Sequence, residues 1–211
     1  MSEINPQLVD KFVTMAKSVA ATVVEVSSME EVLKYVVDVC EKKLPCQILA
    51  DEPGTPTGPL GPNGCPTRLQ RIIGASQLAD EDFAALKALA DEKGFLLLRD
   101  GIRKYAAGID IGVNYAMAGV AASGTCMCDT NNEDVRLCGM ISEISMMILK
   151  KSDIVKDLPA LAPIMRAQIG SSSEPSFTSL ITGPSRTADI ECVSAVGVHG
   201  PLELHILLME G

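Results

Sequence analysis

The chain of 211 residues is long enough to bury a sizeable hydrophobic core, and we expect residues 1–211 to form a single domain. Its net charge of −9 argues against nucleic-acid partners, because a surface that binds phosphates needs clustered lysines and arginines. Neither an apolar run of membrane-spanning length nor a signal peptide is visible, so we expect a cytoplasmic protein without membrane insertion.

The N-terminal part is predicted to be helical over residues 6–43. Apolar side chains recur at three- and four-residue steps through residues 6–25, which indicates a first helix. Ser28 and Glu31 have the spacing of a capping box and open a second helix. A short apolar run at 46–50 then predicts a buried strand.

Residues 51–68 are dense in proline and glycine and show almost no periodicity. This pattern predicts a long loop. Such a loop in a compact domain is a lid, a partner-binding segment or a plain flexible excursion.

The middle and C-terminal parts alternate between short apolar runs and helical patterns. Helices are expected at 80–93, with Gly94 as the C-cap, at 115–122, where small residues are frequent, and at 152–169. The predicted strands are 71–73, 95–98, 109–113, 125–129, 145–149, 177–181, 192–196 and 202–208.

These elements predict an α/β fold of three layers, with a mostly parallel sheet flanked by helices. The apolar runs lack a clean alternation of apolar and polar residues, which is typical of strands that are covered on both faces. Only a short glycine-rich turn separates the last two strands, so we expect an antiparallel C-terminal strand pair.

Polar groups are concentrated where the C-terminal strands turn. Gly183 permits a tight turn at a strand end. Ser185 or Thr187 can cap a following helical turn and leave free N–H groups, while Arg186 adds a fixed positive charge. Together these groups suit a carboxylate or a phosphate.

Purely structural roles explain these candidate binding residues equally well. Arg186 can pair with Asp189 or Glu191 and only hold the loop. His199 lies between glycines, where it is either a base or donor facing a cleft, or a turn histidine bonded to backbone. Asp110, in an apolar strand end, either orients a ligand or caps a turn.

The seven cysteines show no disulfide framework, so we expect free thiols. Cys126 and Cys128 face one side of a predicted strand, but no second pair has the spacing of a zinc or iron–sulfur site. We therefore expect buried thiols, no metal and no cofactor.

The C-terminal stretch closely resembles the signature of LUD-domain proteins, the family of lactate-utilisation protein C. The resemblance extends through most of the chain and is most specific at its C-terminal end. It rests on residues 181–191, 197–201 and 203–205, and in the middle of the chain on 112–113, 119–125, Arg136 and 151–155.

The resemblance implies the fold of the superfamily of ribose-5-phosphate isomerase, glucosamine-phosphate deaminase and CoA transferases. It also implies a role in oxidising lactate to pyruvate beside iron–sulfur oxidoreductase subunits. The family has no well-established catalytic residues to carry over. Family members commonly have acidic residues where this chain has Met117 and Ala122. Candidate ligand-binding residues are therefore Gly183, Ser185, Arg186, Thr187, Asp189, His199 and Asp110.

Three functions follow as hypotheses. The first is an accessory subunit of lactate utilisation that binds a small carboxylate or phosphate. The second, by fold analogy, is an enzyme that acts on a sugar phosphate, an acyl-CoA or a folate-like substrate. The third is a non-catalytic interaction protein that docks through residues 51–68. The sequence leaves the oligomeric state open, a homo-oligomer included.

Overall fold

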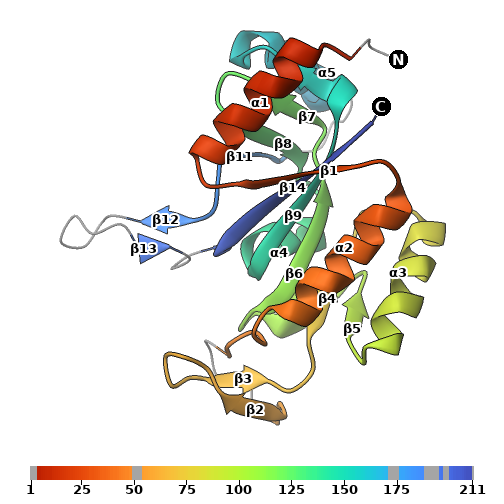
Figure 1. Cartoon of the computed structure of the whole chain (residues 1–211), viewed down its shortest axis with the longest axis vertical. Helices are drawn as coiled ribbons and strands as arrows, with labels where there is room; N and C mark the ends of the chain where they lie inside the picture. The colour runs from red at the N-terminus through yellow and green to blue at the C-terminus, as the bar shows by residue number, and fades with distance from the viewer. Residues whose placement is uncertain (1–3, 49–53, 171–175, 188–194, 197–199, 211) are drawn as a thin grey trace.

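The computed structural model describes residues 4–48, 54–170, 176–187, 195–196 and 200–210. Its main element is a six-stranded sheet in which every pairing is parallel (Figure 1). This confirms the predicted α/β class with a mostly parallel sheet. In spatial order the strands are β1 (Thr22–Val26), β14 (Glu203–Met209), β9 (Ser142–Lys150), β6 (Ile109–Tyr115), β4 (Ile72–Gly74) and β5 (Leu96–Leu98).

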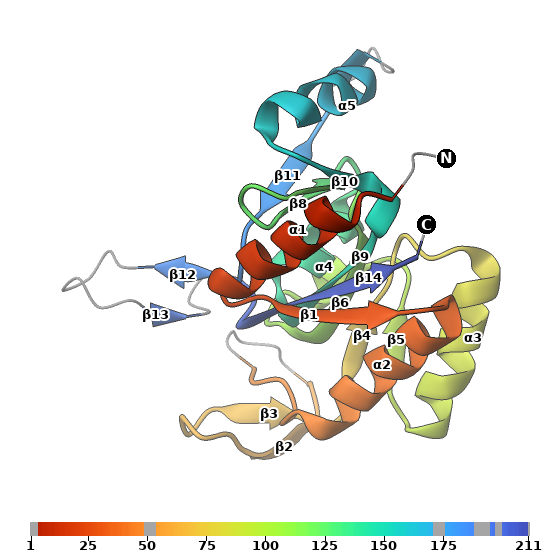
Figure 2. The same ribbon diagram turned by 45° about the horizontal axis from the view of Figure 1, so that its top comes forward.

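Helices cover both faces of this sheet (Figures 1 and 2). On one face, α2 (Met29–Lys42) and α3 (Asp80–Glu92) bury Val36 and Leu86 against Ile111 and Met146. On the other face, α1 (Pro6–Ser18) packs Phe12 against the sheet, while α4 (Glu133–Met140) covers β6 and β9. The sheet is therefore flanked by helices as predicted.

A second, four-stranded sheet lies on the α1 side of the first one. Its strands in spatial order are β10 (Ile154–Val155), β7 (Ala118–Val120), β8 (Thr125–Asp129) and β11 (Thr178–Ile181). The pairings of β8 with β7 and with β11 are antiparallel. Helix α5 (Leu158–Gly170) packs Leu161 onto this sheet. Two 3₁₀ turns, η1 (Ile102–Tyr105) and η2 (Lys151–Asp153), lie before β6 and before β10.

The predicted antiparallel pairing of the last two strands is wrong. Strand β14 pairs in parallel with both β1 and β9, whereas β13 (Ala195–Val196) pairs antiparallel with β12 (Arg186–Thr187). The reason is burial: residues 204–208 are all buried, which suits a strand between two parallel neighbours better than the arm of a hairpin.

The first predicted helix is too long, because α1 ends at Ser18 and β1 follows it. The chain reverses at Ala20, whose φ of 64° is left-handed. Ser28 caps α2 as predicted: its hydroxyl accepts from the Glu31 N–H, and the Glu31 carboxylate reaches back to accept from the N–H of Ser27, the residue before the cap. The β-branched residues of 22–26 then favour a strand beside β14 over a continued helix.

Two further expectations need correction. The predicted loop at 51–68 contains a hairpin, β2 (Thr57–Leu60) and β3 (Pro66–Arg68), which extends away from the sheets (Figures 1 and 2); residues 51–53 lie outside the described part. The predicted helix at 115–122 is the end of β6 followed by β7. Its small residues reflect close packing, because a Cβ on Gly119 would lie 2.9 Å from the Phe12 ring.

Among the described helices, none combines the length and the apolar character that a membrane crossing requires.

Candidate functional site

The C-terminal motif lines a pocket of about 270 Å³ near the amino ends of β9 and β14. The end of α4 and the end of β11 form the facing walls. None of the lining residues has a charged side chain. The lining consists of Gly139, Met140, Ser145, Leu180, Ile181, Thr182, Gly183, Pro184, Ser185, Gly200, Pro201 and Leu204.

The glycine of the motif fits the turn closely against α1. Gly183 has a φ of +73°, and a Cβ at this position would overlap the carbonyl oxygen of Val19. The Ser185 N–H donates to the Pro201 carbonyl over 2.9 Å, so the turn is fastened to the segment that leads into β14. These contacts give Gly183 a packing role in addition to its place in the pocket wall.

A chain of three hydroxyls reaches the pocket from the second sheet. Thr182 is bonded to Thr125 over 2.7 Å, and Thr125 is bonded to Ser123 over 2.7 Å. Each hydroxyl both donates and accepts, so the direction of this chain can reverse. Ala122 and Met117, the two positions at which the resemblance implied acidic residues, are both exposed.

Ser145 is the unusual member of the lining. Its side chain is 1% exposed, and its hydroxyl has no hydrogen-bond partner among the described residues. Buried polar atoms in folded proteins almost always have partners, so this hydroxyl is a free hydrogen-bonding group in the pocket wall. Sequence reasoning missed Ser145, because a single serine within an apolar strand carries no signal.

The residues predicted to bind an anion are only partly brought together. Ser185 lines the pocket, and the exposed Arg186 follows it directly on β12. Thr187 also lies on β12, so the residues directly after Ser185 are extended and do not form the helical turn that Ser185 was predicted to cap; residues 188–194, which follow Thr187, lie outside the described part. Asp189 and His199, like Glu191, lie outside the described residues.

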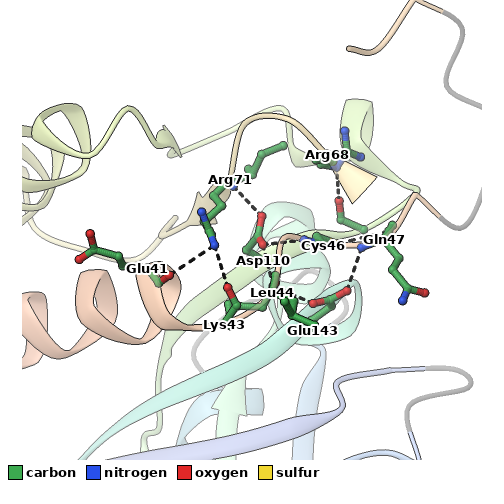
Figure 3. A network of polar contacts seen from close by, with 11 residues as sticks. Glu41, Lys43, Leu44, Cys46, Gln47, Arg68, Arg71, Asp110 and Glu143 are labelled. Carbon is green, nitrogen blue, oxygen red and sulfur yellow. Dashed lines mark hydrogen bonds and ion pairs between the residues drawn. The ribbon is translucent and has the colours of Figure 1, made fainter. Parts of the chain in front are cut away.

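Asp110 is not a ligand-binding residue of this pocket, which corrects the expectation. It is fully buried near the amino end of β6, whereas the prediction placed it at a carboxyl end. Its carboxylate accepts from the Lys43 ammonium (2.6 Å), the Cys46 N–H (2.9 Å) and the Ile72 N–H (2.8 Å) (Figure 3). These donors engage both oxygens, and the side chain joins the segment after α2 to β4.

Lys43 and Glu143 complete this buried polar network (Figure 3). The Lys43 ammonium is 2.7 Å from Glu143, whose other oxygen accepts from the Gln47 N–H. Burial lowers the pKa of Lys43, but the carboxylates of Asp110 and Glu143 outweigh it and raise the pKa above its usual value. The Glu143 carbonyl also accepts from the Leu202 N–H, which links the network to the strand entry beside the pocket.

Of the six cysteines in the described part of the chain, five are buried, and burial raises the pKa of each. The pKa of Cys138 rises to about 11 and that of Cys40 and of Cys128 to about 12. The pKa values of Cys46 and Cys126 are also raised by burial. These thiols are therefore protonated and poor nucleophiles at neutral pH. Within the described ranges, no cluster of His, Cys, Asp or Glu is arranged to hold a metal ion.

A family model, described as LUD domain, matches residues 9–209 of the chain. The chain belongs to the LUD domain family. The uncharacterized protein YkgG of Escherichia coli is 39% identical over 102 residues, which is 47% of this chain and 44% of that protein. Lactate utilization protein C of Bacillus subtilis is 32% identical over 101 residues, or 47% of this chain and 42% of that protein.

The matched stretch thus spans less than half the length of these curated relatives. Among solved structures, a protein of the DUF162 family from Deinococcus radiodurans resembles this LUD domain with a TM-score of 0.53 at 13% identity. The alignment covers 98% of each chain. At this identity the likeness shows the fold alone.

Proposed function

We propose that this LUD-domain protein is an accessory protein of lactate utilisation, which acts beside iron–sulfur oxidoreductase subunits and binds a small carboxylate in its C-terminal pocket. Membership of the family and the names of its relatives in Bacillus and Geobacillus species support the first part. The second part rests on the pocket itself.

The observation that carries the binding proposal is the buried, partnerless hydroxyl of Ser145 in a pocket built by the family motif. A volume of about 270 Å³ suits a small metabolite better than a nucleotide or a CoA ester. The lining is uncharged, so a carboxylate needs a cation from outside it. Arg186, the residue after Ser185, supplies that cation with a fork geometry that matches a carboxylate.

Thermal-shift and calorimetric titrations with lactate, pyruvate, sugar phosphates, nucleotides and CoA esters test the binding proposal. We expect stabilisation by short carboxylates and weaker binding in Arg186→Ala. Arg166→Ala, which removes an exposed arginine from α5 outside the pocket lining, is the matched control. Binding that is equal in both variants, or no binding of any carboxylate, contradicts the proposal.

The partner proposal has a separate test. The tagged protein, co-expressed with the iron–sulfur subunits of a lactate-utilisation system, is expected to purify with them and to carry iron into the eluate. An eluate without iron and without those subunits contradicts the partnership but leaves the pocket untouched.

A further inference from the structure

We propose that α5 carries a contact surface for a second copy of this chain, and that two copies pair through antiparallel α5 helices. The surface is a stripe along one side of the helix, formed by Leu158, Ala162, Met165 and Ile169, which we call the α5 stripe. None of these residues lines the C-terminal pocket, so the inference is independent of the function proposed above.

Helix α5 is anchored to the rest of the protein along one side. Leu161, its one fully buried residue, packs onto the second sheet, and Gln168 accepts a hydrogen bond from the Thr178 hydroxyl of β11 over 2.9 Å. Residues seven apart lie on the same side of a helix, so Leu161 and Gln168 mark the side that faces the sheet. Figure 2 shows α5 at the top of the molecule, where its outer side is turned away from both sheets.

The α5 stripe runs beside the anchored side of the helix. Its members are four, three and four residues apart, which is the spacing of an apolar seam between two packed helices. Leu158 and Ile169 at its ends are each 55% exposed, while Ala162 and Met165 between them are half-buried. The described part of the chain thus leaves both ends of an apolar seam uncovered.

The charges of the helices favour a second copy as the occupant. Arg166 is the one charged residue of α5, whereas α2 and α3 carry several charged residues near both of their ends. With a net charge of −9, two copies repel each other over most of their surfaces and meet most easily at an uncharged face. A helix that binds a membrane surface instead carries several lysines or arginines on its polar face.

The order of the residues makes the stripe complementary to itself. In an antiparallel pair related by a two-fold axis, Leu158 meets Ile169 of the second copy, and Ala162 meets Met165 of the second copy. Each small side chain at the centre then opposes a large one, and branched apolar side chains close both ends. A parallel pair would place alanine against alanine and methionine against methionine, with a gap at one level and crowding at the other.

The length of α5 limits the strength of this contact. The helix has 13 residues and is therefore about 20 Å long. A pair of such helices buries less than the roughly 1,600 Å² of a standard stable interface. We therefore expect a dimer that dissociates on dilution.

Sedimentation velocity of the full chain between about 1 µM and about 1 mM measures this pairing. We expect a reversible equilibrium between monomer and dimer, in which the mean mass rises with concentration. A wild-type chain that is still monomeric at about 1 mM overturns the inference and leaves the pocket proposal untouched.

Two substitutions at the ends of the stripe test its part in the dimer. Leu158→Glu adds an acid to the first turn of α5 and Ile169→Lys adds a base to the last turn; the helix dipole favours both, so we expect folded proteins. Each should raise the dissociation constant of the dimer at least about tenfold, because an unpaired charge enters an apolar contact. Leu60→Glu, at a leucine that is 70% exposed on β2, is the matched control and should associate like the wild type. Wild-type association in both stripe variants, or equal weakening in the control, overturns the inference.

The double variant Leu158→Glu/Ile169→Lys tests the antiparallel order. In the antiparallel pair each new charge lies opposite the unlike charge of the second copy, whereas a parallel pair would bring like charges together. We therefore expect the double variant to associate about tenfold more tightly than either single variant, and less tightly as salt is added. A double variant that associates no better than the single variants overturns the antiparallel pairing.

The iron–sulfur subunits are the competing occupant of the α5 stripe. They are tested by co-expression with the wild-type chain and with Leu158→Glu. If the wild-type chain stays monomeric and Leu158→Glu no longer purifies with those subunits, the stripe binds them and the proposed contact with a second copy is wrong.

Discussion

Replacing Gly183 with alanine tests whether the family motif is packed against the end of α1. Two costs are expected. The φ of +73° is unfavourable for any residue with a Cβ, which costs about 1–2 kcal/mol. The Cβ would also overlap the Val19 carbonyl oxygen and lie 3.3 Å from the Val19 Cβ, which adds an overpacking cost of about 1–3 kcal/mol.

Gly94→Ala is the matched control, because it separates these two costs. Gly94 follows α3 with a φ of +69°, and an added Cβ there has no neighbour within 4 Å. The Gly94→Ala variant is therefore destabilised only by the unfavourable φ and not by a clash. The free energy of unfolding of Gly183→Ala should lie about 1–3 kcal/mol below that of Gly94→Ala.

Urea unfolding followed by circular dichroism measures both variants, provided that the m-value does not change. For a chain of this length the difference corresponds to about 2–4 °C in Tm for each kcal/mol. If the two variants unfold at the same urea concentration, Gly183 does not pack tightly against α1 and the description of the motif as a fitted turn is wrong.

Three further predictions concern the buried groups. Asp110→Asn should lower the free energy of unfolding in urea by about 3 kcal/mol, since an amide presents one acceptor to three donors; a loss below 1 kcal/mol contradicts the network. The stability lost in Lys43→Met should be constant below pH 10.5 and shrink above it. The reason is that folding raises the pKa of Lys43, so its charge stabilises the folded state fully below the pKa of the unfolded chain. That stabilisation is lost as the pH rises through the pKa of Lys43 in the folded state. A difference in unfolding free energy between wild type and Lys43→Met that stays constant up to pH 11.5 contradicts this prediction. Iodoacetamide at pH 8, mapped by mass spectrometry, should label partly exposed Cys65 before the five buried cysteines; rapid labelling of Cys128 in the native protein contradicts its burial.

Sequence patterns predicted the fold class well, because apolar strands and amphipathic helices leave a strong periodic signal. The errors occur where tertiary contacts decide. Residues 22–26 continue the spacing of α1 but pair with β14, and the small residues of 115–122 resemble a helix but belong to closely packed strands. The predicted pairing of β14 was wrong because the prediction used only the short loop before the strand, which suggested a hairpin. Burial on both faces of β14 instead places it between β1 and β9.

The candidate site was predictable only in part, and for a physical reason. Clustered polar residues and glycines drew attention to residues 182–187, which do line the pocket or lie beside it. Asp110 attracted the same attention, but its partners come from Lys43, Cys46 and Ile72, which no local pattern connects to it. Conversely, Ser145 is notable only because the structure gives its hydroxyl no partner, a property that sequence spacing does not encode.

The pocket residues that hold the fold together and those that make no structural contact therefore need different experiments. Gly183 fits against Val19, and Ser185 is fastened to Pro201, so changes in the motif alter the packing of α1 and the entry to β14 together with the pocket. Loss of binding in such variants has a structural explanation as well as a chemical one. Ser145 and Gly139 lack this ambiguity: the first has an unused hydroxyl, and the second has space for a methyl group. The strongest evidence for ligand recognition by this LUD domain must come from these two positions, although neither belongs to the C-terminal signature by which the family is recognised.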